Sequence, residues 1–94
     1  MQIRFVKNIQ FTRLIKADGR LREFNFRKMT LLQETLFSID VVDDRGNRVM
    51  FRMRKEDNEW VIIAQPLPAW VLEQEKVLSD MIKEELNAQT VNVY

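Results

Sequence analysis

The hydrophobic pattern of this chain changes its period at residues 65–70, and this change constrains the fold more than any other feature. Residues 59–65 follow the two-residue period of a β-strand. Beyond the change, apolar residues recur at the spacing of an α-helix as far as Leu86. Pro66 and Pro68 end the strand, because proline cannot donate a hydrogen bond to a sheet. The sequence therefore predicts a sheet and a helix that covers it.

Two glycines predict two β-hairpins in the part of the chain before this change. Asp18-Gly19 lies between two alternating segments, and glycine accepts the positive φ of a tight turn. A hairpin centred on this pair sets Phe11 opposite Phe26. A second hairpin is expected at 44–46, with Gly46 in the left-handed conformation. Its predicted pairs are Val41 with Val49, Ile39 with Phe51, and Phe37 with Met53.

Two shorter segments are less regular. Met29–Thr35 contains a capping-box pattern, which predicts one helical turn between the hairpins. Residues 1–9 form either a separate strand or an extension of the first strand. A third turn is expected at 55–58, and the tail 87–94 is polar and expected to fray.

These elements predict a single domain of the α+β class over residues 1–94. An antiparallel β-meander of about five strands occupies residues 10–65, and one C-terminal α-helix over 68–86 packs on one of its faces. The helix is expected to begin at Pro68, which suits a first helical turn. Sheet and helix together make two layers around one core.

The two faces of the predicted sheet differ in chemistry. The helix-side face is apolar, and its predicted members are Phe37, Ile39, Val41, Val49, Phe51, Met53, Trp60, Ile62 and Ala64. The opposite face, which we call the uncovered face, carries Ser38 and Asp40 and mixes cationic with apolar side chains. Its candidate interaction residues are Arg48, Met50, Arg52, Arg54, Val61 and Ile63. One helix covers only one face of a sheet, so apolar groups in a basic frame predict a contact surface here.

The composition argues against catalysis. The chain has no cysteine and no histidine, which removes thiolate chemistry and the commonest general base and metal ligand. We expect no enzyme activity, cofactor, metal or small-molecule ligand. Charges interrupt the apolar residues that follow Met1, and no segment approaches the length of a membrane span. A cytoplasmic protein without a membrane partner is therefore expected.

Our first functional interpretation is a non-catalytic interaction module that self-associates. A second copy could hide the apolar part of the uncovered face, giving a homodimer.

The alternative interpretation is a domain that binds single-stranded nucleic acid. Residues 1–28 carry eight basic side chains against two acids, and the arginines of this first hairpin and of the uncovered face could contact phosphates. Residues 61–94 carry five acids against two lysines, so the basic strands and the acidic helix could equally attract each other, within one chain or between two subunits. The order of strands and helix, with Trp70 opening the helix, resembles the sheet-then-helix units of Whirly-type and PUR-type single-stranded DNA binders. The competing interpretation is a solvated face whose charges pair across strands, as Asp40 would with Arg52.

Three further groups have a functional and a structural interpretation, and in each case we favour the structural one. Asp40, Asp43 and Asp44 with Asn47 could bind a hard cation, but such residues beside a hairpin glycine are common turn formers. Glu85 and Gln74 fall in the apolar stripe of the helix, and Glu85 is expected to be solvated beyond the sheet edge rather than catalytic. Trp60 and Trp70 could line a ligand slot, but we expect them to close the core.

Overall fold

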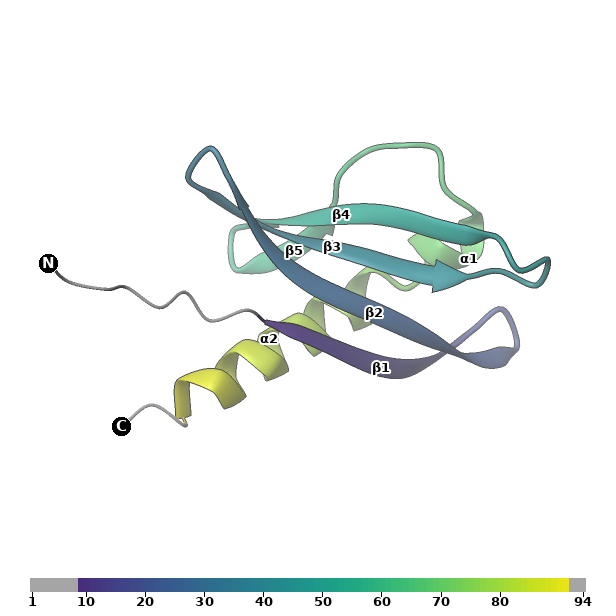
Figure 1. Cartoon of the computed structure of the whole chain (residues 1–94), viewed down its shortest axis with the longest axis horizontal. Coiled ribbons are helices and arrows are strands. Elements are labelled where there is room, and N and C mark those ends of the chain that lie inside the picture. The colour runs from purple at the N-terminus through teal and green to yellow at the C-terminus, as the bar shows by residue number, and fades with distance from the viewer. Residues whose placement is uncertain (1–8, 92–94) are drawn as a thin grey trace, which may run out of the picture.

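The computed structural model describes residues 9–91 and confirms an α+β fold with an antiparallel meander (Figure 1). The sheet has the order β1-β2-β3-β4-β5. A short helix, α1, and a long C-terminal helix, α2, follow it, and α2 lies across one face of the sheet. The elements are β1 Gln10–Ala17, β2 Arg20–Leu31, β3 Glu34–Val42, β4 Arg48–Glu56, β5 Glu59–Ile62, α1 Ala69–Leu72 and α2 Glu75–Val91.

The predicted hairpin registers are confirmed. Phe11 of β1 pairs with Phe26 of β2, and β3 pairs with β4 in the three predicted apolar pairs. Gly46 has a φ of +82°, in the left-handed region that glycine tolerates. Apolar side chains opposite each other on one face specify these registers, because a slip of one residue would turn them into solvent.

The helical turn predicted for Met29–Thr35 is wrong. β2 and β3 stay paired as far as Leu31 and Glu34, and a two-residue turn joins them. Leu32 and Gln33 in this turn have φ values of +49° and +67°, the conformation of a type I′ turn. The continuous strand pairing on both sides therefore overrides the local capping pattern. The turn between β4 and β5 is also tight, with Asp57 and Asn58 at positive φ.

The C-terminal segment also differs from the prediction. The single helix expected over 68–86 is divided, because the N–H of Gln74 donates to the carbonyl of Val71 (2.9 Å), three residues back, and tightens the backbone. The helix does not end near Leu86 with a frayed tail; α2 continues to Val91. Asn87 alone does not stop it, because no glycine or proline follows. Ile9 is buried and its carbonyl accepts from Lys28, whereas residues 1–8 and 92–94 lie outside the described residues.

The core lies between the sheet and the two helices. Phe37 contacts Trp60 edge to face with ring centroids 5.0 Å apart, and Phe11 stacks on Phe26. The helices contribute three fully buried apolar side chains to it: Val71, Leu78 and Ile82. Ala64, predicted in this core, is exposed, because β5 ends at Ile62 and the chain leaves the sheet.

Candidate interaction surface

The six residues predicted for the uncovered face lie on the side of the sheet away from α2. In the register, Arg52 lies opposite Ser38, and Arg54 lies opposite Val61. Ile63 follows β5, and its N–H donates to the carbonyl of Arg52 (2.9 Å), so it stays beside β4. Met50 and the three arginines are exposed, and Val61 and Ile63 are half-buried. The structure therefore brings these residues together on one surface.

Sequence reasoning missed the apolar residues that β1, β2 and β3 add to this face. Leu14, Leu21 and Val42 are exposed to between 50% and 64%, and strand alternation sets them on the uncovered face because their neighbours face the core. Met29 lies opposite Leu36, which is buried although no helix lies over it. The register of the first hairpin could have located Leu14 and Leu21 in advance.

A polar groove crosses the same face. It contains Arg27, which sequence reasoning did not assign to this face. Thr12 Oγ1 donates to Asn25 Oδ1 (2.7 Å), and Asn25 Nδ2 donates to Asp40 (3.0 Å). Arg27 and Arg48 flank this row of side chains. The groove has a volume of about 470 Å³ and is lined by Gln10, Phe11, Thr12, Asn25, Phe26, Arg27, Asp40 and Arg48.

The arginines of the uncovered face differ in their partners. Arg54 forms an ion pair with Glu56 (3.0 Å). Within residues 9–91, Arg27, Arg48 and Arg52 form no ion pair with a carboxylate. The carboxylate of Asp40 accepts from Asn25 instead of pairing with Arg52. Three guanidinium groups on this face thus remain available to a partner.

Three arginines of the first hairpin have carboxylate partners within the fold. Arg13 forms a 2.9 Å ion pair with Glu85 of α2, and Arg20 and Arg22 both contact Asp44 (3.1 Å). The prediction that Glu85 is solvated beyond the sheet edge is therefore wrong. Glu85 lies over β1, and its side chain is 19% exposed. These charges connect parts of the fold and are already neutralised.

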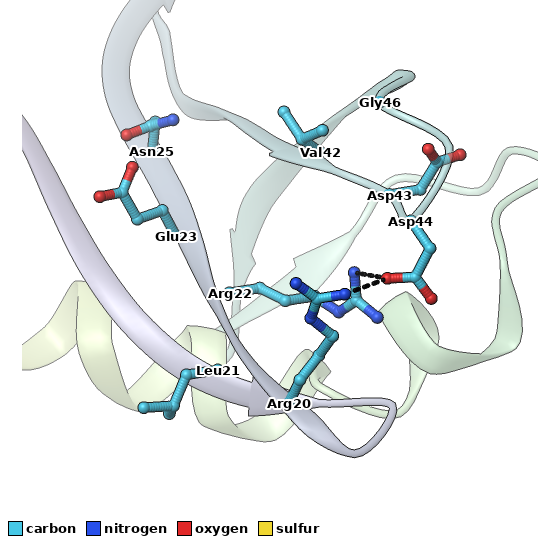
Figure 2. Close-up of a pocket in the computed structure, with 9 residues that line it drawn as sticks. All are labelled: Arg20, Leu21, Arg22, Glu23, Asn25, Val42, Asp43, Asp44 and Gly46. Carbon is cyan, nitrogen blue, oxygen red and sulfur yellow. Dashed lines mark hydrogen bonds and ion pairs between the residues drawn. The ribbon is translucent and has the colours of Figure 1, made fainter.

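Arg20, Arg22 and Asp44 lie in a cleft between β2 and the turn that joins β3 to β4 (Figure 2). The pairing of β2 with β3 begins at Asn25 and Asp40, so the strand ends beyond this pair separate. Figure 2 shows the two arginine side chains reaching from β2 across to Asp44 at the start of the β3–β4 turn. The cleft has a volume of about 380 Å³. The hydrogen bond from Arg22, more than any other interaction, lowers the pKa of Asp44 below its ordinary value.

Arg22 is buried although it is charged. Its Nε donates to the carbonyl of Ala17 (2.9 Å), and its Nη2 lies 3.8 Å from a carboxylate oxygen of Asp18. The indole of Trp70 packs against the guanidinium. Trp60 is buried in the core, as expected. Trp70 is half-buried and packs against the core, as expected, and it also covers an arginine at the end of the sheet.

The aspartates around the second hairpin have separate structural roles. Asp43 Oδ1 accepts from the backbone N–H groups of Arg45 (2.9 Å) and Asn47 (2.8 Å), which is the pattern of a turn-forming aspartate. Asp40 and Asp44 bond to Asn25 and to the arginines described above. In the described part of the chain, no three potential metal-ligating side chains form a cluster.

Comparisons with known proteins give no match: no protein-family model, no curated protein and no solved structure is similar to this chain. Among residues 9–91, no helix has both the length and the apolar character needed to cross a membrane.

Proposed function

We propose that this protein is a non-catalytic interaction module that forms a homodimer through the uncovered face. The observation that carries the proposal is the set of exposed apolar side chains on a sheet face that no helix covers, among them Leu14, Val42 and Met50, each exposed to 50% or more. Exposed apolar side chains rimmed by polar and charged residues are typical of protein contact sites. The sequence grounds given above also lead us to propose a cytoplasmic location.

The cations of this face support a protein partner. Four of them are arginines: Arg27, Arg48, Arg52 and Arg54. Arginine and methionine are enriched at protein interfaces, whereas lysine is depleted. The face also carries carboxylates, among them Asp40 and Glu23, so a second copy can offset the charges of the first. An interface between two identical faces needs such self-complementarity.

The test is the molar mass in solution, measured by light scattering over a range of concentrations. We expect a mass near twice 11.3 kDa for the natural sequence. Met50→Glu and Ile63→Glu should shift the equilibrium to the monomer, because each places a charge in the interface. Leu72→Glu is the matched control, since Leu72 is a half-exposed apolar residue on α1, away from this face. A monomer at all concentrations, or equal effects of all three variants, would contradict the proposal.

A second candidate function is binding of single-stranded nucleic acid. It is favoured by the three arginines of the uncovered face that have no carboxylate partner within residues 9–91, since guanidinium groups bind phosphate bidentately. We expect oligonucleotide affinity that falls steeply with salt, and a loss of about 1 in the logarithmic salt slope for Arg52→Gln. Arg45→Gln, in an exposed turn, is the control. No binding at low salt would exclude this function.

A further inference from the structure

The two edge strands of the sheet differ in how their outward N–H groups are satisfied. On β5, the N–H of Trp60 donates to Ser79 Oγ (2.9 Å) and the N–H of Ile62 donates to Glu75 (2.8 Å), so α2 covers this edge. Free N–H groups on an edge strand are a template for pairing with another chain, and natural sheets often cover them. The β5 edge is therefore closed to a further strand.

The outer edge of β1 is not closed in this way. The turn at Asp18–Gly19 makes Ala17 and Arg20 the first hydrogen-bonded pair of the hairpin. Alternation from this pair directs the backbone of the odd-numbered residues toward β2, in agreement with the bond from Lys28 to Ile9. The even-numbered residues present N–H and C=O groups outward: Gln10, Thr12, Leu14 and Lys16. Within residues 9–91, no group bonds to these outward N–H groups.

We infer that this edge pairs with β1 of a second copy, antiparallel about a twofold axis at Leu14. In this register Leu14 meets Leu14 of the second copy, and Thr12 meets Lys16. Arg13 lies opposite Ile15, so no like charges are directly opposed. Hydrogen-bonded pairs in an antiparallel ladder exchange two bonds each, and the outward groups of both copies then satisfy one another.

Neighbouring registers are less favourable. An axis at Arg13 would set that arginine against its own copy, which is destabilising because like charges would be directly opposite. An offset of a single residue would place the helix-covered face of one copy beside the uncovered face of the other. The axis at Leu14 also pairs two side chains that are each 61% exposed in the single chain. The pairing uses the backbone edge of β1, so it does not depend on the proposed dimer of uncovered faces, although Leu14 belongs to both surfaces.

The first test uses single cysteines, which are clean probes because the natural chain has no cysteine. Two residues paired across the axis have Cα atoms about 5.5 Å apart, within the range that a disulfide spans. Leu14→Cys should therefore form a disulfide-linked dimer on mild oxidation. Thr12→Cys is the matched control: it is exposed on the same face of β1, but its two copies would lie roughly 14 Å apart. Equal cross-linking of the two variants, or none, would overturn the inference.

The second test is amide hydrogen exchange of the natural chain at low and high concentration. The amides of Thr12, Leu14 and Lys16 should exchange fast in the monomer and become at least tenfold slower in the dimer. The amides of Arg13 and Ile15, which point toward β2, should be protected at both concentrations. A dimer in which the three outward amides still exchange fast would overturn the edge pairing while leaving the uncovered-face dimer intact. Slow outward amides in a dimer that survives Met50→Glu would support the edge and contradict the proposed function.

Discussion

The guanidinium carbon of Arg22 lies 4.6 Å from the centroid of the Trp70 ring. This contact joins the first hairpin to α1, and Arg22 also bonds to Asp44 at the start of the β3–β4 turn. One buried cation thus connects three segments that are far apart in the sequence. Its charge is balanced by Asp44 and by the face of the indole, which is attracted to cations.

Replacement of Arg22 should therefore destabilise the fold even when the charge is kept. Arg22→Lys retains the cation but loses the planar group that stacks on Trp70 and bonds to Ala17 at the same time. We expect a loss of about 1–3 kcal/mol in the free energy of unfolding, measured by chemical denaturation. The control is Arg20→Lys, which contacts the same Asp44 oxygen from a position exposed to 65%. Equal losses in the two variants would contradict this role.

Removal of the Ser79 hydroxyl should weaken the attachment of α2 to β5. In Ser79→Ala, the buried N–H of Trp60 loses its acceptor, and an unsatisfied buried donor costs about 1–3 kcal/mol. Thermal and chemical unfolding measure the loss. Asn87→Ala, on the exposed side of the same helix, should change stability by less than about 0.5 kcal/mol. A Ser79→Ala protein as stable as this control would show that the bond contributes nothing.

Glu59 should make stability depend on pH in the acid range. Lys83, followed by Lys76 and Ser79, lowers the pKa of Glu59 from 4.5 to about 2. The carboxylate of Glu59 thus contributes to the free energy of unfolding above pH 4.5, and this contribution is lost as the pH falls through about 2. Glu59→Gln should flatten the decline in the free energy of unfolding across this interval. Glu34→Gln changes an exposed carboxylate that forms no ion pair within residues 9–91, and should leave the decline unchanged.

The turn between β2 and β3 should be open to stabilisation. Leu32 is fully exposed at a φ of +49°, which is unfavourable for a residue with a branched side chain, and Gln33 has a φ of +67°. Replacing the pair by Asn-Gly, which prefers this conformation, should raise the free energy of unfolding by about 1 kcal/mol. Asn58→Gly in the turn between β4 and β5 should give a smaller gain, because asparagine already tolerates positive φ. An unchanged unfolding midpoint for Asn-Gly would contradict this expectation.

The sequence predicted the meander and its registers because apolar residues recur in pairs around turns that contain glycine. Val41 with Val49 and Phe11 with Phe26 are examples in which one face must be buried. It failed at Leu32–Gln33, where neither residue favours the turn that it forms. In that case the pairing of twelve-residue β2 with β3 decides the conformation, and such long-range pairing is not visible in a local pattern.

The uncovered face was predicted only in part, because pairing between distant strands is not visible in a local pattern. Arg48, Met50, Arg52 and Arg54 followed from the alternation of one strand. The contributions of Leu14 and Arg27 required the pairing of β1, β2 and β3 as well. Composition left two interpretations of the basic first hairpin open, because it counts charges without their partners, and the ion pair of Arg13 with α2 agrees with attraction between strands and helix. Arg13 and Arg22 are basic in the sequence but are neutralised by Glu85 and Asp44 in the fold.

The cover that α2 places on β5 also limits how far sheets of this protein can grow. If two copies join along β1, both outer strands of the resulting ten-stranded sheet are β5, and Ser79 and Glu75 occupy the N–H groups of each. A third copy then finds no strand to extend. The same helix that completes the core would in this way act as a terminator of polymerisation, so that pairing of edges yields a finite particle instead of a fibril.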